Sequence, residues 1–134
     1  MVINARSERQ RLPTDVLIDF ERALSAEKGG FYLFAIVRRA DAPQFQDLVV
    51  SAPWLKPGSL DDLRFIISRA QLVFTPDQMA ILSAVHILDK DAPFVTAMNQ
   101  VFAIEHAFNF LSNMQPFGHV TVKAAMIVTS KGKS

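Results

Sequence analysis

Apolar residues near the start of the chain recur at helical spacing. In LPTDVLIDFERALSAEKGG, residues 12–30, Thr14 stands where a helix cap is expected, and Gly29 with Gly30 where a helix ends. Between these signals, the apolar residues share one helical face: Val16, Leu17, Phe20 and Leu24. The pattern predicts an amphipathic helix.

Two segments that are apolar on both faces follow this helix. FYLFAIVRR, residues 31–39, and DLVVSAPWL, residues 47–55, predict buried strands, the second of which ends before Pro53. A strand with two apolar faces is expected in the middle of a sheet or under cover on both sides. The short connection between the two segments favours an antiparallel pair.

Two later segments carry the signals of helix N-termini. In PGSLDDLRF, Ser59 and Asp62 match a capping box, in which each side chain accepts a hydrogen bond from the other residue's backbone. In TPDQMAILS, Thr75 is the expected cap, with Pro76 at the first helical position and Gln78 at the third. We expect a helix after each signal.

The next segments predict a short strand and another helix. AVHILD, residues 84–89, is the strand, and KDAPFVTAMNQ, residues 90–100, is the helix, with Asp91 as its expected cap. The helix is predicted to end near Asn99. Its inward-facing residues are Phe94, Val95 and Met98.

The last part of the chain predicts a β-hairpin. Two alternating runs, VFAIEHAFNFL (101–111) and HVTVKAAMIVTS (119–130), flank the turn segment SNMQPFG. A helix that continues through Leu111 is the competing interpretation, because Val101, Phe102 and Phe108 also extend the preceding helical face. We favour the strand, since the downstream run is strongly β and a turn signal separates the two runs.

Together these elements predict an α/β (or α+β) fold in the order α-β-β-α-α-β-α-β-β. Strand–helix–strand crossovers flanked by hairpins favour a mixed sheet of about five strands with helices packed on it. Residues 13–130 are expected to form one globular domain. Residues 1–12 are interpreted as a flexible basic N-terminal tail, and residues 131–134 as a flexible C-terminal tail.

Composition adds an argument for self-association. Hydrophobic residues make up 50% of the 134 residues, and 11 Phe stand against one Tyr and one Trp. One modest core does not hide so many Phe side chains, so we expect a buried interface between copies of the chain. The predicted partners are a second copy and a further protein that the sequence does not identify.

Charge and the absence of cysteine narrow the function classes. The formal net charge is +1, so neither a nucleic acid nor a membrane partner is expected. The alternative is that the basic tails contact nucleic acid. The absence of cysteine excludes disulfides, thiol nucleophiles and thiolate metal sites. With no secretory signal and no apolar run near the ~20 residues that span a bilayer, a cytoplasmic protein is expected.

Glu105 and His106 are the only Glu and His that are adjacent in the sequence. As strand neighbours they would project from opposite faces, so we do not expect an acid–base pair. His106 is expected among apolar side chains in a core or an interface. If the hairpin turns about residue 115, Glu105 lies opposite Ala125 and diagonal to Lys123, which predicts a structural ion pair, with a catalytic Glu105–Lys123 pair as the alternative.

No metal site and no cofactor are expected. In the same register the last two of the three histidines lie ~17 Å apart, too far for one zinc ion; the three are His86, His106 and His119. The five glycines form none of the phosphate-binding motifs. Asp47, Asp89 and Glu105 could offer oxygen ligands to Mg²⁺, but their spacing specifies no such site.

Five residues complete the candidates for a binding surface or interface. Arg38 and Arg39, at a strand end, either mark where the strand reaches water or hold a phosphate or carboxylate. Trp54, between two prolines, is interpreted first as a lid on the core and second as an anchor for a partner. Phe102 and Phe108 share the expected strand face of His106.

Two functional hypotheses remain. The favoured one is a self-associating protein-interaction module without catalytic activity, which needs Phe102, Phe108 or Trp54 on one exposed or interfacial patch. The alternative is a small metal-dependent hydrolase or nuclease that uses strand-end carboxylates. That enzyme needs its charged residues to converge in one cleft: Asp47, Asp89, Glu105 and Lys123.

Overall fold

The fold combines a β-sheet with helices that are interspersed among the strands along the chain. The computed structural model describes residues 12–39, 45–112 and 122–131. The helices are α2 (Thr14–Lys28), α3 (Leu60–Val73), α4 (Pro76–Ile81) and α5 (Pro93–Val101), and the strands are β1 (Leu33–Arg39), β2 (Gln46–Ser51), β3 (Leu82–Ile87), β4 (Asn109–Ser112) and β5 (Val122–Ser130). The predicted α/β class is confirmed, and the elements follow one another in the predicted order.

β1 is the middle strand of a five-stranded sheet with the order β3-β2-β1-β5-β4. It pairs antiparallel with both β2 and β5, while β2 and β3 are parallel and β4 and β5 antiparallel. Every residue from Leu33 to Val37 is buried, as two apolar faces require of a central strand. The antiparallel pairing of β1 with β2 is confirmed.

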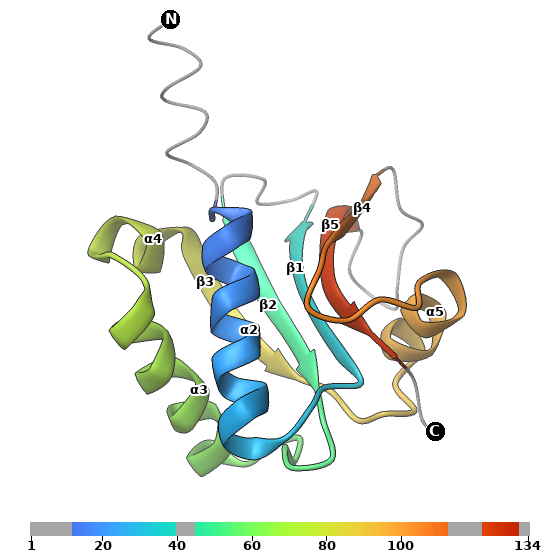
Figure 1. Cartoon of the computed structure of the whole chain (residues 1–134), viewed down its shortest axis with the longest axis horizontal. Coiled ribbons are helices and arrows are strands. Elements are labelled where there is room, and N and C mark those ends of the chain that lie inside the picture. The colour runs from blue at the N-terminus through green and yellow to red at the C-terminus, as the bar shows by residue number, and fades with distance from the viewer. Residues whose placement is uncertain (1–11, 40–44, 113–121, 132–134) are drawn as a thin grey trace, which may run out of the picture.

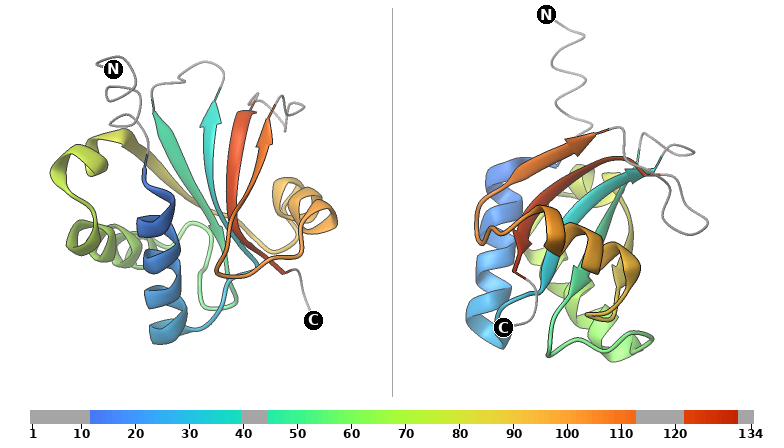
Figure 2. Two further views of the ribbon diagram at one scale, coloured as in Figure 1. Left: turned by 45° about the horizontal axis from the view of Figure 1, so that its top comes forward. Right: turned by 90° about the vertical axis from the view of Figure 1, so that its right-hand side faces the viewer.

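Helices cover both faces of this sheet (Figure 1, Figure 2). α2, α3 and α4 pack on one face, where Phe20 of α2 meets Phe34 and Phe74 edge-on, with ring centroids 6.0 and 5.2 Å apart. α5 packs on the other face through Phe94, Val95 and Met98, the three residues predicted to face inward. The domain therefore has two apolar cores, separated by the sheet.

These two cores account for much of the Phe content. Among the residues whose burial is described, six phenylalanines are buried: Phe20, Phe31, Phe34, Phe74, Phe94 and Phe102. A sheet covered on both faces hides more aromatic surface than the single core assumed from composition. The Phe content by itself is therefore no longer evidence for an interface between copies.

Two of the predicted capping signals are present in α3 and α4. The Ser59 hydroxyl accepts from the Asp62 N–H at 3.2 Å. Thr75 and Gln78 form the complete capping box. The Asp62 carboxyl, however, accepts from the Lys56 N–H at 2.8 Å, rather than from Ser59.

Two other capping expectations were wrong. Pro13 is the N-cap of α2, so Thr14 lies inside the first turn and its hydroxyl contacts the Met126 sulfur at 3.8 Å. Ala92, not Asp91, caps α5. In both places a Pro sets the start, Pro13 at the N-cap of α2 and Pro93 at the first position of α5.

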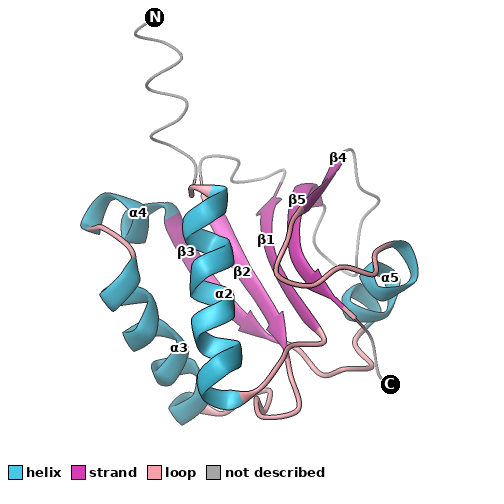
Figure 3. Ribbon diagram, in the orientation of Figure 1, coloured by secondary structure: helices cyan, strands magenta, loops and turns pink. Residues whose placement is uncertain are grey.

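The predicted long hairpin was wrong over residues 101–108. α5 continues to Val101, and β4 contains only residues 109–112, so neither the strand nor the competing helix through Leu111 holds. Between them, residues 102–108 form a loop with a single bridge from Ile104 to Ser130 (Figure 3). The register also differs, because Leu111 rather than Glu105 stands opposite Ala125.

The domain begins at least one residue earlier than predicted. Leu12, assigned from the sequence to the N-terminal tail, is 1% exposed, and its backbone N–H donates to the Gln46 side chain at 3.3 Å. Leu12 therefore belongs to the core under α2. The rest of both predicted tails, residues 1–11 and 132–134, lies outside the described residues.

The edge-on ring contacts of Phe20 indicate that its side chain contributes strongly to stability. Phe20→Ala should lower the free energy of unfolding by about 3–5 kcal/mol, because it empties the centre of the α2 core. Leu72→Ala, at a side chain that is 79% exposed, should change it by less than about 0.5 kcal/mol. Urea unfolding followed by circular dichroism measures both, and similar losses in the two variants would contradict this account of the core.

Candidate functional site

A buried glutamate lies at the centre of a cluster of hydrogen-bonded side chains. Glu21, on α2, is 0% exposed. Its Oε2 accepts hydrogen bonds from the Thr129 hydroxyl at 2.8 Å and from the Ser25 hydroxyl at 3.2 Å. A carboxyl group on the apolar face of a helix needs such donors, since burial without them costs several kcal/mol.

His106 makes the third side-chain contact to Glu21. Its Nδ1 pairs with Glu21 Oε1, and its backbone N–H donates to the Thr129 hydroxyl at 3.2 Å. The φ of His106 is 55°, in the left-handed region, which costs a non-glycine residue about 1–3 kcal/mol. The contacts to Glu21 and Thr129 hold the loop in this conformation, and we call Glu21, Ser25, His106 and Thr129 the Glu21 cluster.

Glu105 lies on the outer side of this cluster. Its Oε2 accepts from the Lys131 ammonium at 2.7 Å and lies 3.7 Å from His106 Nε2. The hydrogen bond from Lys131 lowers the pKa of Glu105; partial burial opposes this, and the charges of Lys131 and His106 add to it. The pair is half-exposed, so its contribution to stability is small.

The Glu21 cluster is better suited to holding a loop than to catalysis. A buried carboxyl group that holds one nitrogen of an imidazole also occurs in enzymes, where it orients a general base. Here the hydroxyls of Ser25 and Thr129 both donate to Glu21, so neither is held by the histidine as a nucleophile. The contacts join α2, β5 and the loop before β4.

The sequence placed Glu105 and His106 wrongly. They are not on opposite faces of a strand, because the loop lets their side chains lie 3.7 Å apart. The partner of Glu105 is Lys131, not Lys123. Ile104 bridges Ser130, and the backbone of Lys123 lies seven residues earlier in β5, roughly 23 Å away along the strand.

Glu21 was missed from the sequence, although a signal was present. It stands between Leu17 and Leu24 on the buried stripe of α2, four residues after one and three before the other. A charged residue at such a position must find a partner in the core. That partner could not be named, since His106 and Thr129 lie far along the chain.

A second histidine–carboxyl pair joins β2 and β3. His86 Nε2 lies 3.1 Å from Asp47 Oδ2, with the His86 side chain 48% exposed and that of Asp47 3% exposed. The parallel register places Val49 opposite His86 and Asp47 opposite Ala84. The pair therefore links the edge strand β3 to its neighbour β2.

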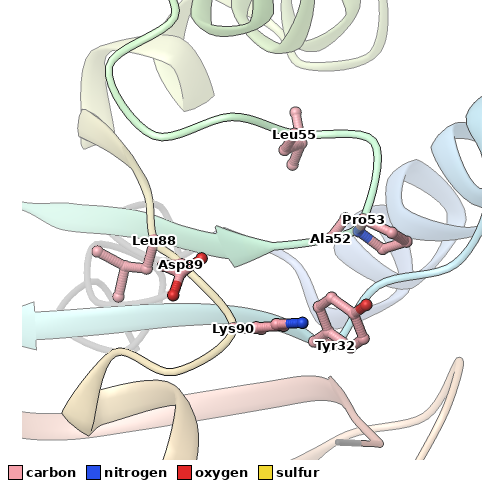
Figure 4. Close-up of a pocket in the computed structure, with 7 residues that line it drawn as sticks. All are labelled: Tyr32, Ala52, Pro53, Leu55, Leu88, Asp89 and Lys90. Atoms are coloured by element: carbon pink, nitrogen blue, oxygen red, sulfur yellow. The ribbon is translucent and has the colours of Figure 1, made fainter. Parts of the chain in front are cut away.

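Asp89 lies at a different place, beyond the end of β3. It lines a pocket of about 280 Å³ together with residues from the chain after β2 and before β1. Figure 4 shows this pocket, with Lys90 and Tyr32 beside the end of β2. Asp89 Oδ2 accepts from the Asp91 N–H at 3.2 Å.

The carboxylates proposed for a metal-dependent enzyme do not converge. Ala84, opposite Asp47, is five residues before Asp89, which separates them by roughly 16 Å at the spacing of a strand. Glu105 lies beside Lys131, beyond the end of β5. Within residues 12–39, 45–112 and 122–131, no three His, Cys, Asp or Glu residues are grouped as metal ligands.

Trp54 fits the role of a lid on the core. Its indole N–H donates to the Gly29 carbonyl at 2.8 Å, and its ring contacts Phe31 and Phe65 edge-on. Gly29 has a φ of 119°, which only glycine adopts readily. The Trp54 ring would lie 3.4 Å from a Cβ at that position, so Trp54 and Gly29 together fix the end of α2.

The other interface candidates are divided between core and surface. Phe102 is 9% exposed and belongs to the α5 core, whereas Phe108 is 45% exposed. Arg38 is half-buried near the end of β1 and stands opposite Ala124. Arg39 stands opposite Val122, and the placement of its side chain is outside the description. These residues do not form one patch.

Comparison of the chain with protein-family models, curated proteins and solved structures finds no match. Among the described residues, no helix has the length and apolar character to cross a membrane. The cytoplasmic location expected from the sequence stays a prediction.

The contact between His106 and buried Glu21 should matter more for stability than the contacts of exposed Glu105. His106→Ala should lower the free energy of unfolding by about 1–3 kcal/mol, because it leaves a buried carboxyl oxygen without its donor. Adding Glu21→Gln to His106→Ala should cost less than the sum of the two single losses. Glu105→Ala, on the exposed side, is the control and should cost less than about 1 kcal/mol. Additive losses in urea unfolding would contradict the cluster.

The Glu105–Lys131 pair predicts a pH dependence. The pKa of folded Glu105 lies below its ordinary value of 4.5, so the pair stabilises the fold above that value and loses its effect as the pH falls through the lowered pKa. Lys131→Met should cost less than about 1 kcal/mol at neutral pH. The difference from wild type in urea unfolding should shrink toward zero in acid; a constant difference would contradict it.

Proposed function

We propose that the domain works by self-association, through the outer edge of β3. β3 is the last strand on its side of the sheet, and β2 is its neighbour. The Leu88 N–H donates to the Val50 carbonyl at 2.8 Å. Since bonding direction alternates along a strand, the backbone groups of Val85 and Ile87 point away from β2 and can pair with another strand.

The sequence of β3 supports this proposal, because it lacks the usual protection of an edge. LSAVHI contains no Lys, Arg, Asp, Glu or Pro, the residues that commonly prevent edge pairing. A register shift after Gln46 leaves Ala84–Ile87 as the regular part of the edge. β4, at the opposite edge, has only four residues, and such a short strand is itself protected.

Symmetry favours a second copy of the chain as the partner. Two β3 strands can pair antiparallel about a two-fold axis perpendicular to the sheet, since each copy then presents the same surface. This operation keeps the helix-covered faces of the two sheets on matching sides. The half-buried side chains of Val85 and Ile87 would lose further apolar surface to water on pairing.

We favour this function over the metal-dependent hydrolase. The enzyme needs the carboxyl groups of Asp47, Asp89 and Glu105 in one cleft, whereas Asp47 pairs with His86 and Glu105 with Lys131. The edge of β3, by contrast, needs no rearrangement to pair. The single observation that carries the proposal is an uncharged edge strand in a sheet whose other edge is short.

Ser83→Lys tests the proposal. Ser83 is exposed on β3, and in a two-fold interface one substitution brings two like charges to the same edge. We expect wild type to sediment as a dimer and Ser83→Lys to weaken dimerisation by a factor of about ten or more. Sedimentation velocity over a concentration series measures this, with circular dichroism to verify folding.

Ser68→Lys is the matched control. Ser68 is also an exposed serine but lies on α3, so the same substitution should leave the dimer intact. A wild-type protein that stays monomeric over the whole series, or a Ser83→Lys variant that associates like wild type, would overturn the proposal.

A further inference from the structure

We propose that the pocket at the ends of β2 and β3 binds a small zwitterionic amino acid with an uncharged side chain. The pocket lies where the two parallel strands end, lined by Ala52 after β2 and by Leu88 after β3. The carboxyl ends of parallel strands are the usual place of ligand sites in open α/β sheets. The position is independent of the β3 edge proposed for self-association.

The size of the pocket limits the ligand. Its volume is about 280 Å³, at the lower end of the roughly 300–1,000 Å³ typical of small-molecule sites. A free amino acid fits within such a volume. The size of the pocket is therefore consistent with a small metabolite as the ligand.

The two charged side chains of the pocket suit a ligand that carries one positive and one negative group. Asp89 and Lys90 are neighbours of opposite charge in the pocket lining. In the described part of the chain, the Lys90 side chain makes no hydrogen bond or ion pair, and the Asp89 carboxyl accepts only from the Asp91 N–H. A ligand with an ammonium and a carboxylate group pairs with both, whereas a ligand of one charge leaves the other side chain unmatched.

Apolar residues line the rest of the pocket, and a buried hydroxyl without a partner lies one residue before it in the sequence. Pro53, Leu55 and Leu88 line the pocket, which suits an uncharged side chain on the ligand. Ser51 precedes the pocket residue Ala52, is 1% exposed, and its hydroxyl has no hydrogen-bond partner among the described residues. A buried hydroxyl without a partner is uncommon in proteins and marks unmet hydrogen-bonding capacity at this end of β2.

The test is a titration followed by ¹H–¹⁵N NMR of the full chain with L-alanine, L-valine and L-leucine. We expect saturable shifts at the backbone amides that line the pocket: Tyr32, Ala52, Leu88, Asp89 and Lys90. Lys90→Met and Asp89→Asn should each weaken binding by a factor of about ten or more, as loss of a charged contact does. Asn keeps the oxygen that accepts from Asp91.

Two controls make the result specific. Lys56→Met removes an exposed lysine from the neighbouring loop, outside the pocket lining, and should bind like wild type. Isovalerate and isobutylamine are valine without its ammonium and without its carboxylate, and both should bind at least about ten times more weakly than valine.

Three outcomes would overturn the proposal. They are the absence of saturable shifts with all three amino acids, shifts that map away from the pocket, and isovalerate or isobutylamine binding as tightly as valine. Ser83→Lys keeps every pocket residue, so that monomeric variant should bind amino acids normally. Failure of ligand binding and failure of self-association are therefore separate results.

Discussion

The buried carboxyl group of Glu21 is the constraint on which the second half of the structure depends. It sits at 0% exposure on the face of α2 that packs on the sheet, where a polar group without partners is strongly unfavourable. Donors from α2 itself, from β5 and from the loop before β4 meet this need. The left-handed conformation of His106 costs about 1–3 kcal/mol, and the two hydrogen bonds that His106 makes to Glu21 and Thr129, at about 1 kcal/mol or more each, offset it.

This constraint explains why the chain leaves α5 as a loop. An extended strand through residues 101–111 would carry His106 along β5 and away from α2, leaving Glu21 without its third donor. The loop instead lets Phe102 complete the α5 core and turns His106 toward α2. One polar group in one core thus determines how the other core ends, although the sheet separates the two.

Local signals predicted much of the fold, and long-range partners limited the rest. β1 and β2 were recognisable as buried strands, and the capping signals at Ser59 and Thr75 located two helix starts, because these patterns lie within a few residues. The loop at residues 102–108 was missed, since alternation of apolar residues was the only local cue and the deciding contact is 85 residues away. Among the candidate site residues, Glu105 was found with the wrong partner, and the Asp89 pocket emerges only when the ends of β1, β2 and β3 are brought together.

The position of β5 has a consequence for synthesis of the chain. β5 follows the other four strands of the sheet along the chain, yet it lies between β1 and β4 in the sheet. Until it is made, β1 is an edge strand, and its apolar stretch from Leu33 to Val37 has no neighbour on one side. The nascent chain must therefore keep this apolar strand from pairing with other chains until β5 has been translated. Because synthesis runs from the N-terminus to the C-terminus, the central strand β1 receives its second neighbour last.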